Sequence, residues 1–256
     1  TPMRASPKNS NLKTETLEQF IEDELPEETG IKGQLNNLRD RARDQTLKNI
    51  SELVKTEDSV GLITLPTGFG KTFAGLAAGL KACDITGGNL VYALPYTSIL
   101  DQTATDVERI FDVDVTDPSF SLHHHLSTTL SNLGEKYTDA DIGRSVGTLH
   151  AESWRSQLTL TTTVQLFESL AAPTGRQATK LPALQDAVVV IDEPQAIPER
   201  WWKIVVDLIA MLTTHYDATV ILMTATQPRL IEYGTKQVES MTLVGDSGVY
   251  VDFLKE

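Results

Sequence analysis

The chain has little of what secreted and membrane proteins require. It contains one cysteine, Cys83, among 256 residues, so it cannot carry a disulfide framework of its own. No run approaches the roughly 20 uninterrupted apolar residues of a membrane span, and the polar start TPMRASPKNS has no signal-peptide core. These absences predict a cytoplasmic protein in a reducing environment, with no membrane partner.

Basic residues are scarce as well. Lys and Arg number 22 against 35 Asp and Glu, which gives a net charge of −13 at pH 7. Binding of nucleic acid by counterion release needs Lys and Arg facing phosphates, so the composition argues against a protein that holds nucleic acid by bulk electrostatics. An acidic surface is also typical of adaptation to high salt, which screens attraction to phosphate. The charge therefore leaves a nucleic-acid partner open.

Short apolar strands alternate with helices along most of the chain. The strands are expected at Val60–Leu65, Leu90–Leu94, Leu158–Thr161, Ala187–Ile191 and Thr219–Met223. The helices are expected at Thr72–Ala82, Ser98–Phe111, Val164–Ala171 and Trp201–Leu212, with an amphipathic helix from Leu35 onward. Strands that are apolar on both faces and separated by helices predict an α/β fold, with a mostly parallel β-sheet covered by helices on both faces.

The two ends of the chain are predicted to lie outside this domain. Residues 1–33 are polar and carry the acidic patch Glu22–Glu28, which indicates a linker with at most one short helix. Residues 233–256 are expected to extend toward another domain. The main domain is therefore predicted over residues 34–232, with 112–150 as its least regular part.

The segment LPTGFGKT follows the first strand and opens an Ala- and Gly-rich helix. In this arrangement the loop amides and the helix N-terminus face phosphates, Lys71 neutralises them and the Thr72 hydroxyl coordinates Mg²⁺. Leu65 replaces the first glycine of the strict G-x-x-x-x-G-K-[ST] pattern, and a glycine-rich turn with an incidental Lys-Thr is the alternative. The predicted nucleotide-binding residues are Thr67, Gly68, Phe69, Gly70, Lys71 and Thr72.

The segment VVVIDEPQAIP ends an apolar strand in two adjacent acids. Alone, such a pair is often only a strand meeting a turn. With a phosphate loop about 120 residues upstream, a carboxylate at the C-terminal end of a neighbouring parallel strand suits Mg²⁺, and a second one suits the attacking water. Asp192 is therefore predicted to hold the metal, together with Thr72, and Glu193 to act as general base.

Two further segments, ALPYTSILDQ and LTTTVQLFESL, pass from a strand into a helix at the same edge of the predicted sheet. Hydroxyls and amides at helix starts suit sequence-neutral contacts with a sugar-phosphate backbone and need no positive charge. The alternative is that Thr161–Thr163 only continue a β-branched strand and that Ser98 only caps a helix. The predicted DNA-binding residues are Pro95, Tyr96, Thr97, Ser98, Thr162, Thr163 and Gln165.

Taken in order, LPTGFGKT, ALPYTSILDQ, HHHLS, LTTTVQLFESL, VVVIDEPQAIP and VILMTATQP resemble a known group of proteins. They look like the first RecA-like domain, a P-loop NTPase fold, of superfamily 2 helicases. More narrowly, the chain resembles the CRISPR-associated helicase-nuclease of type I interference systems over roughly residues 35–230. That resemblance implies ATP and Mg²⁺ as cofactors, translocation along single-stranded DNA, and recruitment by a guide-RNA surveillance complex.

The resemblance also implies roles for single residues. Thr224, Ala225 and Thr226 match the segment that links the nucleotide site to nucleic acid. Gln195 is predicted to lie near the γ-phosphate and to hydrogen-bond to Thr224 or Thr226, so it joins Lys71, Asp192 and Glu193 as a catalytic residue. Gln45 matches the upstream glutamine that reads adenine, although one glutamine on a polar helix face is also simply a surface residue.

The chain departs from the group in two places, and a run of histidines needs separate consideration. It has no His-Asp dipeptide, so the HD nuclease domain of the group is expected elsewhere. The second RecA-like domain has no counterpart after Pro228. Histidines 123–125 stand where the group often has paired histidines, and consecutive residues of an extended segment point to opposite faces, which disfavours a shared metal ion.

Three function classes remain. The first is the motor lobe of a single-stranded DNA helicase that is incomplete for turnover without its second lobe. The second is the ATPase lobe of another superfamily 2 DNA translocase. The third is a non-catalytic nucleic-acid or assembly module.

Overall fold

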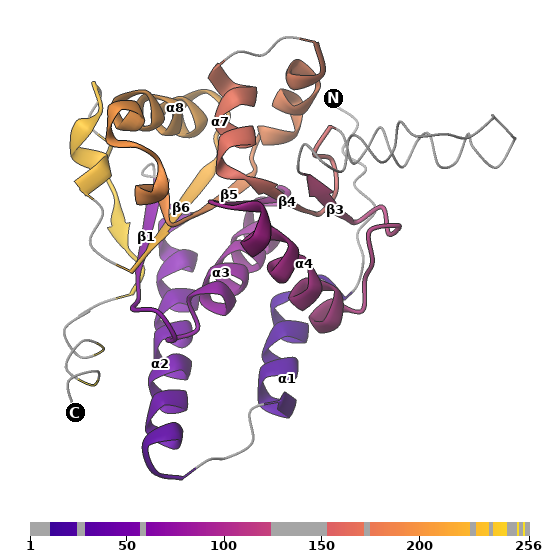
Figure 1. The fold of residues 1–256 in the computed structure, drawn as a ribbon, viewed down its shortest axis with the longest axis vertical. Helices are drawn as coiled ribbons and strands as arrows, with labels where there is room; N and C mark the ends of the chain where they lie inside the picture. Colours follow the sequence, from indigo (N-terminus) through magenta and orange to yellow (C-terminus); the bar gives the residue numbers. More distant parts are fainter. Residues whose placement is uncertain are drawn as a thin grey trace, which may run out of the picture.

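A parallel β-sheet organises the chain (Figure 1). The computed structural model describes residues 11–24, 29–56, 60–123, 153–171, 175–225, 229–235, 238–244, 250 and 253. Over these residues the sheet has seven strands in the order β3-β4-β2-β5-β6-β1-β7, all paired in parallel. The strands are β1 (Val60–Thr64), β2 (Leu90–Leu94), β3 (Phe120–His123), β4 (Leu158–Thr162), β5 (Val188–Asp192), β6 (Thr219–Thr224) and β7 (Met241–Thr242).

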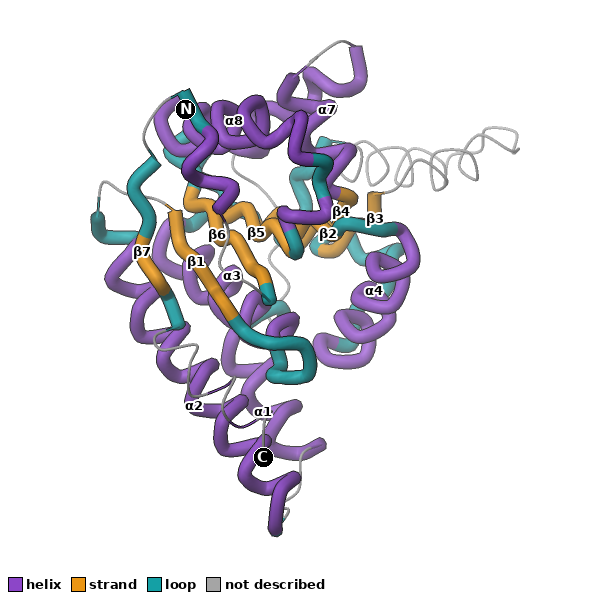
Figure 2. The backbone as a smooth tube through the Cα atoms, turned by 60° about the vertical axis from the view of Figure 1, so that its left-hand side comes forward, coloured by secondary structure: helices purple, strands orange, loops and turns teal. Residues whose placement is uncertain are grey.

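Helices cover both faces of the sheet. The α-helices are α1 (Thr14–Glu24), α2 (Gly30–Leu53), α3 (Lys71–Thr86), α4 (Thr97–Phe111), α7 (Thr163–Ala171) and α8 (Trp202–His215). The 3-10 helices are η1 (Gly175–Leu184), η2 (Pro194–Ala196), η3 (Glu199–Trp201) and η4 (Arg229–Tyr233). Figure 2 shows α1–α4 on one side of the strands and α7 and α8 on the other. The predicted α/β fold with a parallel sheet between two helical layers is confirmed.

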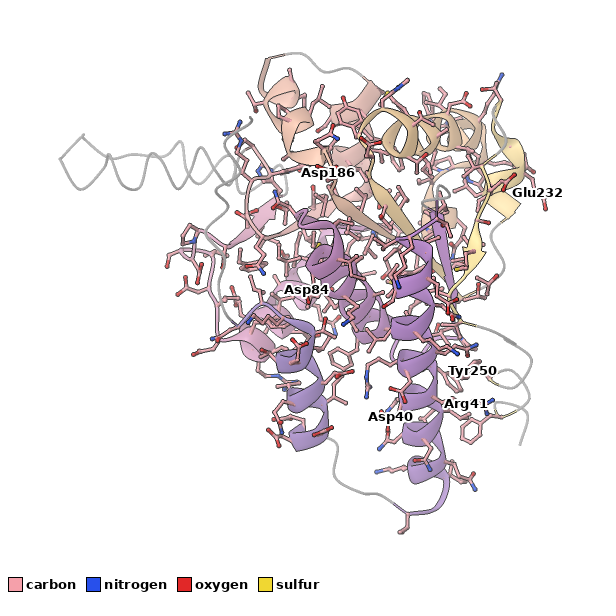
Figure 3. All side chains as sticks on the ribbon, turned by 180° about the vertical axis from the view of Figure 1, so that it is seen from behind. Asp40, Arg41, Asp84, Asp186, Glu232 and Tyr250 are labelled. Atoms are coloured by element: carbon pink, nitrogen blue, oxygen red, sulfur yellow. The ribbon has the colours of Figure 1, made fainter. Side chains whose placement is uncertain are left out.

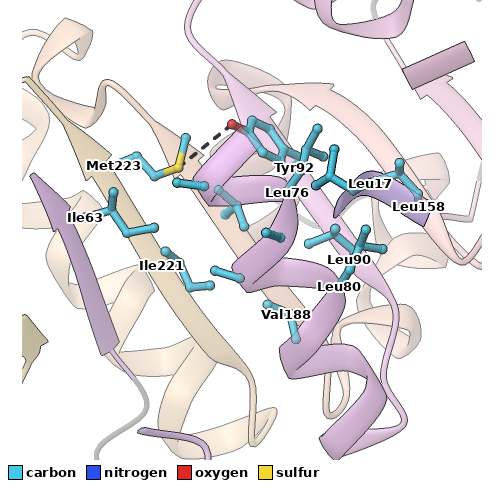
Figure 4. Packing of buried hydrophobic residues seen from close by; sticks show 14 of the residues in the cluster. Leu17, Ile63, Leu76, Leu80, Leu90, Tyr92, Leu158, Val188, Ile221 and Met223 are labelled. Carbon is cyan, nitrogen blue, oxygen red and sulfur yellow. Dashed lines mark hydrogen bonds between the residues drawn. The ribbon is translucent and has the colours of Figure 1, made fainter. Parts of the chain in front are cut away.

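The two-residue period of a strand divides the core into two parts. In β5, Val188 and Val190 pack with α1–α4, whereas Val189 and Ile191 pack with α7 and α8. Figure 4 shows the first of these cores, in which α3 lies over the central strands. Helices cover both faces of the sheet, so both faces of each central strand are buried. This is why the strands read as uninterrupted apolar runs in the sequence.

The predicted strands agree with β1, β2, β4, β5 and β6 to within one residue at each end. Two short strands were missed. β3 lies in the region predicted to be least regular, and β7 lies in the predicted C-terminal extension, where it pairs with β1. Strands of four and two residues are too short for their periodicity to stand out from a loop.

Residues 14–24, within the predicted N-terminal linker, form the one short helix that the prediction allowed. They form α1, and Leu17 and Ile21 are 0% and 3% exposed within the core on the α3 side. α2 also begins at Gly30, ahead of the expected boundary at 34. Figure 3 shows α1 and α2 from behind, with Asp40 and Arg41 on α2 and Tyr250 beside them. The remainder of the predicted domain division stays a prediction.

Candidate functional site

The phosphate loop joins the end of β1 to the start of α3. Gly68 and Gly70 adopt left-handed conformations, with φ of 89° and 72°, which favour glycine over residues with a Cβ. Gly70 is the N-cap residue of α3, so the free amides of the first helical turn open toward the loop. Phe69 is different, because its ring is 1% exposed and packs edge-on against Tyr250 and Phe253. The backbone of Phe69, and not its side chain, is available to a nucleotide.

Arg39 of α2 holds the phosphate loop from the opposite side. Its Nε and Nη2 donate hydrogen bonds to the Gly68 carbonyl oxygen at 2.9 and 2.7 Å, and its Nη1 donates to Asn36 Oδ1 at 3.0 Å. This role could not be predicted from the sequence, since an arginine on the polar face of a helix usually contacts only solvent. α2 therefore fixes the loop through a guanidinium fork.

A cavity of about 380 Å³ opens between the phosphate loop, α1, α2 and α4. Its polar lining includes Arg39, Arg43, Thr67, Lys71, Thr72 and Asp106. Gln45, the predicted adenine contact, is half-buried on α2 and is not among the described residues that line this cavity. Its role stays a prediction. Arg39 and Arg43, on the same helix, do line the cavity.

The predicted catalytic residues come together beside the loop. Lys71 Nζ forms an ion pair with Glu193 and lies 3.9 Å from Asp192 Oδ1. Gln195 Nε2 donates a hydrogen bond to Glu193 Oε2. Glu193 itself has a left-handed backbone, with φ of 47°, which costs about 1–3 kcal/mol in a residue with a side chain. Lys71 therefore balances only one of the two negative charges that Asp192 and Glu193 bring to this site.

Burial shifts the proton equilibria of the pair. It raises the pKa of Asp192 from 3.8 to about 6, and the nearby Lys71 ammonium opposes this rise. It also lowers the pKa of Lys71, while the Asp192 charge acts in the opposite direction. Both shifts have the same origin, because removal from water disfavours the charged form of each group.

The site fits a magnesium ion. Asp192 Oδ1 is buried and accepts no hydrogen bond from the described residues, so it retains a lone pair for a hard cation. Thr72 lies in the first turn of α3 and supplies the predicted hydroxyl. Elsewhere in the described part of the chain, no group of three or more His, Cys, Asp or Glu residues could hold a metal. His124 and His125 lie outside the described residues.

The end of β6 connects the two motifs. The Leu65 amide, which opens the phosphate loop, donates to the Thr224 carbonyl at 3.1 Å, and the Glu193 amide donates to the Met223 carbonyl at 2.8 Å. Thr224 is fully buried and Ala225 half-buried, whereas Thr226 lies outside the described residues. The predicted coupling segment thus touches the phosphate loop through the Thr224 backbone, while Met223, the residue before it, touches the acid pair. A bond from Gln195 to Thr224 or Thr226 stays a prediction.

The predicted DNA-binding residues divide into two groups. After β2, Tyr96 and Ser98 are exposed, and Pro95 and Thr97 are half-buried. After β4, Thr162 and Thr163 are 6% and 3% exposed, so their hydroxyls face the interior in this structure. Parallel pairing places the two segments side by side, with Leu94 opposite Thr162.

A phosphate loop, a helix N-terminus and a strand-end acid pair on one edge of a parallel sheet define a P-loop nucleotide-binding domain. The DEAD/DEAH box helicase family matches residues 42–233, and the chain belongs to that family. None of the described helices is long and apolar enough to span a bilayer.

Comparison with individual proteins confirms the resemblance to CRISPR-associated helicases. The chain is 41% identical over 250 residues to the CRISPR-associated nuclease/helicase Cas3 of Haloferax volcanii, covering 91% of this chain and 26% of that protein. It thus spans about a quarter of the relative's length. The crystal structure of T. fusca Cas3 with ATP matches at a TM-score of 0.54 and 25% identity, over 72% of this chain and 20% of that one.

The fold also occurs in a helicase of another kind. The DUF1998 helicase MrfA bound to DNA matches at a TM-score of 0.56 and 17% identity, covering 96% of this chain and 31% of that one. At this identity the match supports the fold alone.

Proposed function

We propose that the chain is the first motor lobe of an ATP-dependent single-stranded DNA translocase that acts in CRISPR interference in the cytoplasm. The observation that carries the proposal is the meeting of Lys71, Asp192 and Glu193 beside the phosphate loop. This arrangement pairs a phosphate-binding cation with a metal-binding carboxylate and a general base, as ATP hydrolysis requires. The 41% identity to a Cas3 protein supports the CRISPR context.

Each residue has a defined task in this proposal. Lys71 leaves Glu193 and binds the β- and γ-phosphates, while amides of the loop and of the α3 N-terminus bind the remaining phosphate oxygens. Thr72 and Asp192 hold Mg²⁺, and the bound ion supplies positive charge that offsets the developing charge on the γ-phosphate. Glu193, released from Lys71, accepts a proton from the attacking water.

The DNA strand is proposed to lie along the C-terminal edge of the sheet. The exposed side chains after β2 and the first turn of α7 after β4 occupy neighbouring positions on this edge. The segments from 94 to 101 and from 161 to 168 contain no Lys or Arg, so contact would depend on hydroxyls, amides and Tyr96. Such contacts weaken less with added salt than phosphate binding by lysine and arginine does.

The direct test is DNA-stimulated ATP hydrolysis by a protein that carries this chain and its second RecA-like lobe. We expect single-stranded DNA to raise the rate, and Glu193→Gln to lower kcat by about 10²- to 10⁴-fold while nucleotide binding persists. A hydrolysis rate that does not change when DNA is added, or that is not lowered by Glu193→Gln, would refute the proposal. A requirement for a guide-RNA complex would separate the CRISPR function from that of another superfamily 2 translocase.

A further inference from the structure

Lys180, in η1, is a buried cation outside the nucleotide site. Its side chain is 3% exposed, which is rare for lysine because removing an ammonium from water costs several kcal/mol unless other groups replace the water. The Lys180 Nζ lies 4.8 Å from the centroid of the fully buried Trp154 ring. The negative face of the indole replaces part of the lost hydration.

The hydrogen bonds of Lys180 lead to α7. Nζ donates to Gln177 Oε1 at 3.0 Å and to Ser169 Oγ at 3.4 Å. Its third donor reaches the Gln165 side-chain oxygen at 3.2 Å, in the amide orientation that also lets the Gln165 nitrogen donate to the His123 carbonyl at 3.1 Å. One ammonium therefore connects η1, two turns of α7 and, through Gln165, the end of β3.

Gln165 lies in the first turn of α7, where β4 meets the proposed DNA edge. Its backbone amide donates to Thr162 Oγ1 at 3.2 Å, which fixes the connection between β4 and α7. In this amide orientation its side chain bonds to Lys180 and to the His123 carbonyl, and the contact of Gln165 with DNA stays a prediction. Val164, in the same turn, is 62% exposed and faces outward.

We propose that Lys180 is a positioning residue for the DNA-contacting turn of α7. The inference rests on the proposed function and adds a residue to it, because Lys180 orders the first turn through Gln165 without touching DNA itself. Loss of the ammonium leaves the amide oxygens of the half-buried Gln165 and Gln177 without this donor, which frees the turn to take other conformations. The nucleotide site lies beside β1, β5 and β6 and does not share these contacts.

The test compares three variants of the full 256-residue chain. Lys180→Met keeps the length of the side chain and removes its charge, Lys180→Arg keeps the charge, and Lys203→Met changes an exposed lysine on α8 as a control. We measure the Kd for a fluorescent oligothymidine, the Kd for a fluorescent ATP analogue, and hydrogen exchange of the amides of residues 163–166. A thermal unfolding scan confirms that each variant is folded.

We expect Lys180→Met to weaken oligonucleotide binding by about tenfold, as the loss of one or two hydrogen bonds to a charged donor predicts, and to speed amide exchange in the turn. Nucleotide binding should stay unchanged, Lys180→Arg should restore part of the affinity, and Lys203→Met should match wild type. A folded Lys180→Met chain with wild-type oligonucleotide affinity overturns the proposal. So does an equal loss of both affinities, which would indicate a purely structural role.

Gln165→Leu provides a second route if Lys180→Met does not fold. Because both residues act through one contact, the double variant Lys180→Met/Gln165→Leu should lose no more affinity than the more affected single variant. Fully additive losses overturn the proposal. A wild-type chain that binds no oligonucleotide instead refutes the proposed DNA function, which distinguishes that failure from a failure of the Lys180 inference.

Discussion

At the scale of single residues, the nucleotide site holds its charges out of water. Side chains of Lys71 and Asp192 are 11% and 8% exposed. Lys71 balances only one of the two acids that it faces, and burial disfavours the ionised form of Asp192. The same burial that makes the site effective for a metal and a phosphate therefore reduces the stability of the empty protein.

Because burial disfavours the ionised carboxylate of Asp192, we expect Asp192→Asn to stabilise the free chain at pH 7.5. The folded protein binds the proton of Asp192 more tightly than the unfolded chain does, so stability falls as the pH rises from about 4 to about 6. At pH 7.5 the full penalty is present, and its removal should raise the free energy of unfolding by about 1–3 kcal/mol. The gain should vanish below pH 4, where the carboxyl is protonated in both states.

Urea unfolding of wild type and Asp192→Asn across this pH range measures the effect. Asp44→Asn, on the exposed face of α2, is the matched control and should show no such pH dependence. The idea fails if Asp192→Asn is less stable than wild type at pH 7.5. Mg²⁺-dependent nucleotide binding should be weakened in the same variant, since the predicted metal ligand is absent.

At the scale of secondary-structure elements, the phosphate loop depends on two helices. α3 supplies the N-terminal amides, while α2 holds the Gly68 carbonyl with Arg39. A loop of left-handed glycines has much conformational freedom, so an external constraint reduces the entropy that nucleotide binding must remove. The order of the loop is thus set partly by a residue 29 positions upstream.

Arg39→Lys should therefore weaken nucleotide binding although the charge is kept. A lysine ammonium cannot reproduce the two hydrogen bonds by which the guanidinium clasps the Gly68 carbonyl oxygen, and the loss of about one hydrogen bond corresponds to roughly tenfold in Kd. Titration with a fluorescent ATP analogue measures the change. Arg41→Lys, exposed on the same helix, should bind like wild type, and equal affinities for all three proteins would exclude Arg39 from this role.

At the scale of the whole molecule, the nucleotide site is built at one edge of one sheet, where the strands β1 and β5 end. The chain spans 26% of its Cas3 relative, and the second RecA-like lobe with its arginine is expected on the rest of such a protein. That arginine stabilises developing charge on the transferred phosphate, which is worth about 10³- to 10⁵-fold in rate. The residues of this lobe are predicted to provide nucleotide binding, metal coordination and a general base, but not that arginine.

We therefore expect the isolated chain to bind Mg-ATP but to hydrolyse it at least about 10³-fold more slowly than a protein that includes the second lobe. Equilibrium binding and phosphate release, measured on both proteins in the same buffer, test this. Fast turnover by the isolated chain that Glu193→Gln abolishes would show that the lobe is sufficient by itself. Turnover that Glu193→Gln leaves intact would indicate a contaminating ATPase.

Local patterns in the sequence allowed the phosphate loop and the central strands to be predicted. The conformation of LPTGFGKT was predictable from local residues, because its glycines permit left-handed turns and the following Ala-rich stretch is a helix. The central strands were found since burial on both faces leaves uninterrupted apolar runs. Contacts between distant segments were not predictable in this way. Leu17 and Ile21 of α1, in a polar and acidic stretch, enter the core only because α3 and α4 offer an apolar surface to cover.

The sequence by itself determined the class of fold, the phosphate loop and the acid pair, because each depends on residues that are adjacent along the chain. Only the tertiary structure decided what surrounds them. It brought Arg39 to Gly68, buried Thr162 and Thr163, and placed the Gln165 side chain beside Lys180. Hydrogen bonds and burial of this kind join segments that lie far apart in sequence, and their energies depend on the packed environment rather than on local pattern.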